Sequence, residues 1–424
     1  MRKTQTSLSS RRADGFTVVE LAVSMLVLVV VLLGTLALFD FTNRVSNVQS
    51  NVANMQQSQR TAQQDLIRTV RMAGRGPIPL GPPPIGLAVA VYDQVPDDTR
   101  VGGAGTPLVV PGSDILTVRG VLETSVYQIN ASSLTAFEFV RHGDGTVTGH
   151  VDVDNYSPSG IPQDQAALKE AIASAQPERL VLVSSRNPEF WTLVELDPGP
   201  SGEIAGETIH LEFKSLPATD PTDDPAYFDL PAFNPIEDLG SVAFVGILEE
   251  HRFYLRQGTK LAPGGGQDLA PQLSRARVFP GTDRPWRGSA ADVDHPSWQL
   301  DIADNIVDMQ VALAFDSPRG GGRIRDDDDN VGDDDRIFEA DDGVADDWLF
   351  NDSSVVTPLE WTNQTLYFIR VTTLARTDRR DPGYESPDMV RLENHDLTGS
   401  RFNDATDRTF RYRSLESLID MRNL

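Results

Sequence analysis

The chain of 424 residues contains no cysteine, which excludes disulfide bonds and thiolate metal sites. Basic residues are scarce, because 37 Lys and Arg stand against 62 Asp and Glu and give a formal net charge of −25. Such a charge disfavours nucleic acid and anionic lipid surfaces as partners of the main body. The six histidines are scattered, and no His-Glu-x-x-His, Gly-x-Ser-x-Gly or P-loop motif occurs. The sequence therefore predicts a protein that is not an enzyme and that binds no nucleic acid.

One long apolar run lies near the N-terminus. As a helix, Leu21 to Leu38 would span about 27 Å, close to the thickness of a bilayer's hydrocarbon core. Proline is missing from this run, which leaves Gly34 as its one weak point. The run is preceded by four basic residues, Arg2, Lys3, Arg11 and Arg12. No basic residue follows it until Arg44. This asymmetry places the N-terminus in the cytoplasm and predicts that the rest of the chain is exported.

Glu20 stands at the start of this run, where burying a carboxylate in lipid costs at least ~2.5 kcal/mol. The stretch GFTVVELAVSMLVLVVVLLG, which begins at Gly15, resembles the N-terminus of type IV prepilins and pseudopilins. The resemblance implies that a prepilin peptidase cuts between Gly15 and Phe16 and that Phe16 is then N-methylated. Glu20 would pair with the Phe16 amine of a neighbouring subunit, which fixes the axial register of a filament. The alternative is a solvated glutamate at the membrane surface on an ordinary anchor.

The helical pattern continues beyond the membrane segment as an amphipathic helix. Apolar residues recur at steps of three and four from Val45 to Ala73, and Gln59 fills a gap in the series. Gly74 and the following Gly-Pro pair end the pattern. The predicted organisation is a leader at 1–15, a transmembrane or filament-core half-helix at 16–41, an amphipathic half-helix at 42–74 and an exported domain at 75–424. The apolar stripe packs on a sheet or, alternatively, forms a coiled coil with another subunit.

The exported domain reads as strands joined mostly by loops, with one short helix at Gln163–Ala175. The expected fold class is therefore α+β, a long N-terminal helix packed on a large antiparallel β-rich domain of pilin-like layout. Gly143-Asp144-Gly145 predicts a hairpin turn. The predicted strands are Ser113–Arg119, Ser125–Ile129, Ala136–Arg141, Thr146–Val153, Arg179–Ser184, Phe190–Leu196, Thr208–Phe213, Ser241–Leu248, His251–Arg256, Val307–Phe315 and Thr365–Ala375.

A second resemblance lies in this domain, in the order of five segments: SDILTVR at 113–119, HRFYLRQ at 251–257, DNIVDMQVALAFD at 304–316, LYFIRVTTLARTDRRDPGY at 366–384 and FRYRSLESLIDMRNL at 410–424. Together they are similar to PilW-type minor pilins, which are related to the J-type minor pseudopilins of type II secretion. The resemblance implies a subunit that primes pilus assembly near the tip, with other minor pilins and the major pilin as partners. The chain would reside in the inner membrane, with its body in the periplasm, before it joins a pilus at the cell surface. Alternatives are a type II secretion pseudopilin, a pilin-stem adhesin and an exported enzyme on a single-pass anchor.

Two groups of residues in the sequence have side chains that can ligate a metal. The insert at 317–364 holds twelve Asp or Glu residues between Asp326 and Asp347, which favours a solvated loop. Its alternative is a calcium site with oxygen ligands from Asp326, Asp328, Asn330, Asp333 and Asp335. The second group, His150, Asp152 and Asp154, alternates along a predicted strand. An exposed strand face is the favoured interpretation of that group, and a zinc site is its alternative.

Overall fold

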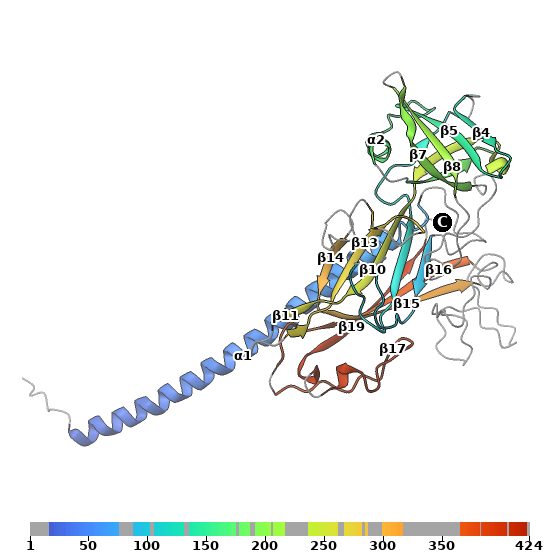
Figure 1. Ribbon diagram of the computed structural model, residues 1–424. Coiled ribbons are helices and arrows are strands. Elements are labelled where there is room, and N and C mark those ends of the chain that lie inside the picture. Colours follow the sequence, from blue (N-terminus) through green and yellow to red (C-terminus); the bar gives the residue numbers. More distant parts are fainter. Residues whose placement is uncertain are drawn as a thin grey trace, which may run out of the picture. The chain divides into compact units, whose positions relative to one another are not determined.

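The computed structural model describes residues 17–75, 88–101, 106–130, 135–174, 178–186, 191–204, 207–216, 236–261, 267–281, 285–286, 299–316, 365–381, 383–404 and 407–421. The chain divides into two compact units, Met1–Asn54 and Met55–Leu424. A long helix, α1, covers Val18–Val70 and so belongs to both units. Figure 1 shows it in blue.

In the first unit, α1 is apolar and exposed. Every large apolar side chain from Val18 to Phe41 is exposed. The hydroxyl groups within this stretch donate to carbonyl oxygens of their own helix, as Ser24 Oγ does to Glu20 O at 2.7 Å and Thr35 Oγ1 to Leu32 O at 2.9 Å. By length and composition this part of α1 could cross a membrane.

In the second unit, α1 buries a single stripe, as the sequence pattern predicted. Its buried side chains are Met55, Gln59, Ala62, Gln63, Leu66, Thr69 and Val70. Gln59 Nε2 donates to the carbonyl oxygens of Thr373 and Arg413, both at 3.1 Å. Gln63 Nε2 donates to Leu415 O, also at 3.1 Å. Two amides thus tie the helix to a sheet of its own chain, in agreement with the preferred alternative for the stripe.

The helix ends four residues before the predicted position. After Val70 the chain tightens into turns, in which Ala73 N donates to Val70 O at 2.9 Å. Gly74 then adopts a φ of 69°, a left-handed conformation that favours glycine. Its N–H donates to Arg119 O at 2.9 Å, so the end of the helix is joined to a strand.

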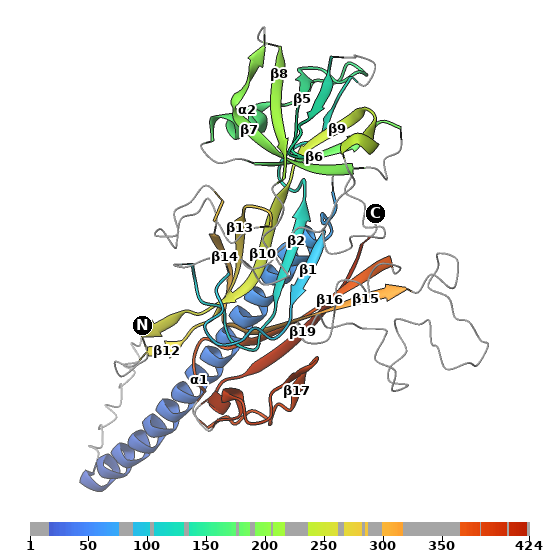
Figure 2. The same cartoon turned by 45° about the vertical axis from the view of Figure 1, so that its right-hand side comes forward.

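Two antiparallel sheets lie beside the part of α1 that belongs to the second unit (Figure 2). The first has the order β1-β2-β10-β13-β14, with bounds Val89–Tyr92, Ile115–Gly120, Glu249–Arg256, Gln272–Val278 and Gln299–Asp304. The second has the order β15-β16-β19, with bounds Ile306–Asp316, Thr365–Arg376 and Tyr412–Asp420. Two short ribbons pair β11 with β12, Thr259–Leu261 and Gln267–Leu269, and β17 with β18, Arg391–Leu392 and His395–Asp396.

A seven-stranded antiparallel sheet is inserted between β2 and β10, which are neighbours in the first sheet. Its order is β3-β9-β6-β7-β8-β5-β4, with bounds Tyr127–Gln128, Val242–Ile247, Arg179–Ser184, Trp191–Ile204, Thr208–Ser215, Val147–Asp154 and Phe137–Arg141. A short helix, α2 (Ala166–Ala173), buries Leu168 and Ala171 in one core with strand residues such as Leu211 and Phe213. The sequence predicted this helix at 163–175. The hairpin turn predicted at Gly143-Asp144-Gly145 is also present, closed by His142 N donating to Thr146 O at 2.8 Å.

Charged residues are buried where β2 and β10 pair. Glu250 accepts from Arg119 Nε at 2.6 Å and from Arg252 Nε at 2.8 Å, and all three side chains are fully buried. Gly281 N donates to the same carboxylate at 3.0 Å. Burial alone would raise the pKa of Glu250, but Arg119 and Arg252 outweigh it and hold that pKa below its ordinary value. Glu250 is therefore ionised inside the core.

The long apolar N-terminal helix and the β-rich domain of antiparallel sheets confirm the α+β class expected from the sequence. All strand pairs between the named strands of the described residues are antiparallel.

Candidate functional site

The start of α1 carries one of the residues that the sequence singled out. Glu20 is exposed, and its Oε2 accepts from Thr17 N at 2.9 Å and from Thr17 Oγ1 at 3.0 Å. Glu20 N lies 3.2 Å from Thr17 Oγ1 in return. This reciprocal pair is a capping box, which satisfies N–H groups that the first helical turn leaves without partners.

The capping box gives Glu20 a local role that the sequence analysis did not predict. Its signal was present in the sequence as Thr17-x-x-Glu20 ahead of an apolar run. Both contacts with Thr17 use Oε2 of the carboxylate. Gly15 and Phe16, the residues of the predicted cut, lie outside the described residues, so the pairing of Glu20 with a neighbouring amine stays a prediction.

The acidic insert also lies outside the described residues. This applies to each residue of the calcium alternative: Asp326, Asp328, Asn330, Asp333 and Asp335. The calcium site therefore stays a prediction, as does the solvated loop that the sequence favours.

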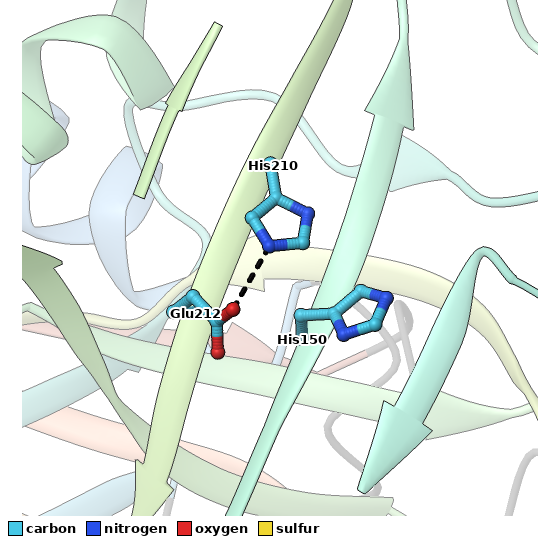
Figure 3. A group of neighbouring side chains, drawn as sticks. All are labelled: His150, His210 and Glu212. Carbon is cyan, nitrogen blue, oxygen red and sulfur yellow. Dashed lines mark hydrogen bonds and ion pairs between the residues drawn. The ribbon is translucent and has the colours of Figure 1, made fainter. Parts of the chain in front are cut away.

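The seven-stranded sheet brings together a different group, His150, His210 and Glu212 (Figure 3). Each of the three offers one ligand atom, and these atoms all lie within 4.8 Å of one another. His150 lies on β5, and the other two residues lie on β8. All three are half-buried.

The pairing of β5 with β8 creates this group. Along β5 the buried residues are Val147, Val151 and Val153, so His150, Asp152 and Asp154 lie on the opposite, outer face. The register places His150 directly opposite Glu212 and Asp152 directly opposite His210. Side chains at such positions are close enough to touch across the strands.

Hydrogen bonds hold both ring nitrogens of His210. Nδ1 lies 2.6 Å from Asp152 Oδ1, and Nε2 lies 2.9 Å from Glu212 Oε1. Partial burial lowers the pKa of His210, but the bonds to Glu212 and Asp152 outweigh it and raise that pKa above its ordinary value of 6.5. Two carboxylates on one imidazole favour its protonated form, in which both nitrogens donate.

His150 is held differently. Its Nε2 lies 3.2 Å from the carbonyl oxygen of Thr135, which can only accept a hydrogen bond. Nε2 therefore carries a proton, and Nδ1 is the ring nitrogen left as a potential ligand. The rings of His150 and His210 have centroids 4.6 Å apart.

Sequence reasoning found half of this arrangement. It placed His150, Asp152 and Asp154 on one strand face, which the structure bears out. It did not find His210 and Glu212, because the register between two strands more than fifty residues apart is not written in either strand alone. Asp154 takes a different partner, since its Oδ1 accepts from Thr208 Oγ1 at 2.7 Å.

Comparisons of the chain with protein-family models, with curated proteins and with solved structures find no match.

Proposed function

We propose that this chain is a membrane-anchored subunit of a pilin-type filament, a minor pilin of the PilW type without enzymatic activity. The observation that carries the proposal is the division of α1. Its first part exposes apolar residues from Val18 to Phe41, and its second part buries Gln59 and Gln63 against a sheet of its own chain. A simple anchor needs only the first part. A filament subunit needs both, because the helix must pack with other helices at one end and carry a folded domain at the other.

The N-terminal residues support the same proposal. A cut between Gly15 and Phe16 creates an amine one residue before Thr17, which already binds Glu20 through its N–H. The capping box holds the carboxylate at the helix start, where the helix dipole favours a negative charge. In a filament, Glu20 would pair with the Phe16 amine of a neighbouring subunit and set the axial step.

A prepilin peptidase processes the chain in the inner membrane, and other minor pilins and the major pilin assemble with it. The β-rich domain then lies in the periplasm before assembly and on the pilus afterwards.

The first test is mass spectrometry of the N-terminus of the protein isolated from membranes and from sheared filaments of the native host. The expected result is a chain that begins at an N-methylated Phe16 in both fractions. A Gly15→Asp variant should accumulate as the uncleaved precursor. An exported enzyme on an ordinary anchor predicts no methylated Phe16, and that result would overturn the proposal.

A second test separates the charge of Glu20 from its capping role. Glu20→Gln keeps a capping-box residue but removes the charge, whereas Glu20→Ala removes both. Both variants should be processed normally and should fail to enter filaments. Asp40→Asn is the matched control, since Asp40 is exposed and pairs with Arg44 of its own helix, at 3.0 Å. Normal filament entry by Glu20→Gln would contradict the proposed charge pair.

A further inference from the structure

The outer face of the seven-stranded sheet carries a row of acidic residues around two histidines. His150 on β5 lies opposite Glu138 on β4 and Glu212 on β8, and Glu212 lies opposite Asp197 on β7. Carboxylates directly opposite each other on a sheet repel. A cation bound among them would remove that repulsion.

We propose that His150, His210 and Glu212 bind one divalent transition-metal cation, with Zn²⁺ as the metal that the ligand set fits best. Two imidazole nitrogens and one carboxylate oxygen, with a fourth position open to water, form a known type of zinc ligand set. Tetrahedral Zn²⁺ holds its ligand atoms about 3.3 Å apart, given bonds of about 2.0–2.1 Å. The three ligand atoms already lie within 4.8 Å of one another, so small side-chain rotations close the site.

Both histidines have the outer partners that metal-bound histidines use. A ligating histidine normally donates its second ring N–H to a carboxylate or a backbone carbonyl, which fixes the ring's orientation and tautomer. His210 has Asp152 for this purpose, at 2.6 Å, and His150 has the carbonyl of Thr135, at 3.2 Å. The remaining nitrogens are Nε2 of His210 and Nδ1 of His150.

Without metal, a proton occupies the position that the cation would take. It lies between His210 Nε2 and Glu212 Oε1, which are 2.9 Å apart. Binding of the cation displaces this proton from His210 to solvent, and the freed lone pair becomes the ligand.

The strands make the site rigid. Val151 and Leu211 are fully buried directly beneath the face that carries the histidines. Gly149 lies so close to its neighbours that an added Cβ would be 2.6 Å from the ring of Phe213. Ligands on paired strands above such a core are held more precisely than ligands on loops.

The ligand set also distinguishes this site from the acidic insert. Ca²⁺ and Mg²⁺ prefer oxygen ligands, whereas imidazole suits Zn²⁺, Cu²⁺ and Ni²⁺. The proposed site does not depend on filament assembly, so the two proposals fail independently.

The test uses the full chain in detergent, freed of metal by a chelator and then dialysed. Zn²⁺ affinity and stoichiometry are measured by competition with a chromogenic zinc chelator. The variants are His150→Gln, His210→Gln and Asp152→Asn. His142→Gln is the matched control, because His142 lies in the β4–β5 hairpin and its ring nitrogen Nε2 lies 2.8 Å from Thr148 Oγ1, outside the proposed ligand group.

The wild type and His142→Gln should each bind one Zn²⁺ at this site, and His150→Gln and His210→Gln should lose it. Asp152→Asn should bind about 10–100-fold more weakly, because it removes an outer partner. No binding by the wild type, or equal binding by all variants, would overturn the proposal.

A second measurement needs no variant. In the wild-type protein, Zn²⁺ should protect His150 and His210 from modification by diethylpyrocarbonate and leave His142 reactive, as read by mass spectrometry. Equal reactivity of the three histidines with and without Zn²⁺ would contradict the site. Co²⁺ should give the visible absorption bands of a nitrogen-ligated ion in the wild type, and a purely oxygen-ligated spectrum would contradict it as well.

Discussion

Glu250→Gln should strongly destabilise the second unit. Glu250 lies between Arg119 and Arg252, and both of its oxygens accept from guanidinium N–H groups. A glutamine keeps one acceptor oxygen, but its NH₂ group would face one of the two arginines. Both of those groups are hydrogen-bond donors, so they cannot bond to each other. Because all three side chains are fully buried, water cannot compensate for the lost charge. Removing one partner from a buried ion pair costs about 3–5 kcal/mol, and we expect a loss in this range.

The free energy of unfolding of the full chain in detergent is measured with urea, followed by tryptophan fluorescence. Urea is preferred to guanidinium because it does not screen charges. Glu203→Gln is the matched control. Its carboxylate pairs with Lys169 at 3.2 Å, but both side chains are largely exposed, so the loss should stay below about 1 kcal/mol. If Glu250→Gln lost no more than Glu203→Gln, the reasoning from burial would be refuted. Replacing the whole triad by apolar residues of similar volume should be far less harmful than Glu250→Gln alone.

Three further changes test other parts of the fold by the same urea assay. Gln59→Met should lose about 2 kcal/mol of stability, because the carbonyls of Thr373 and Arg413 lose their donor, and Gln59→Glu should lose more at neutral pH; equal losses would contradict this hydrogen-bond assignment. Burial holds the pKa of His251 well below 6.5. As the pH falls below 6.5, His251 therefore takes up a proton in the unfolded chain but not in the folded chain. With each pH unit of acidification, the free energy of unfolding of the wild type should fall by up to about 1.4 kcal/mol more than that of His251→Leu. Parallel plots of this free energy against pH would exclude the effect. Gly149→Ala should lose about 1–3 kcal/mol of stability, since its Cβ would clash with the carbonyl oxygen of Glu138 and with the ring of Phe213. Gly143→Ala meets nothing within 4 Å and should be near neutral; similar losses would argue against close packing.

The sequence predicted elements well where local periodicity decides the structure. The stripe of α1 and strand β6, expected and found at Arg179–Ser184, follow from spacing alone. Strand β7 shows the limit of this reasoning. The sequence predicts a strand that ends at Leu196, yet the strand runs to Ile204 through prolines and glycines. Its register shifts between Asp197 and Gly202, and Ser201 Oγ accepts from Glu212 N at 2.9 Å. The Ser201 side chain thus accepts a hydrogen bond from the neighbouring strand, which the pattern of apolar residues in the sequence does not predict.

Strand β13 was missed for a related reason. Its buried positions are Leu273, Ser274, Ala276 and Val278, which include small and polar residues, so the run lacks clear apolar alternation. Register was equally out of reach. His150 and Asp152 were visible as a polar strand face, but the neighbours that complete the site come from the pairing of β5 with β8. Long-range pairing depends on the whole sheet and its core, which no local window contains.

The bond between Gln63 and Leu415 joins residues 352 positions apart. A ribosome that adds about 5–20 residues per second needs about 20–70 s to make the intervening chain. Throughout this interval the buried face of α1 has been synthesised. The strand β19, whose Leu415 carbonyl accepts from the amide of Gln63, has not yet been made. The packing of α1 against β19 can therefore form only when nearly the whole chain has been made.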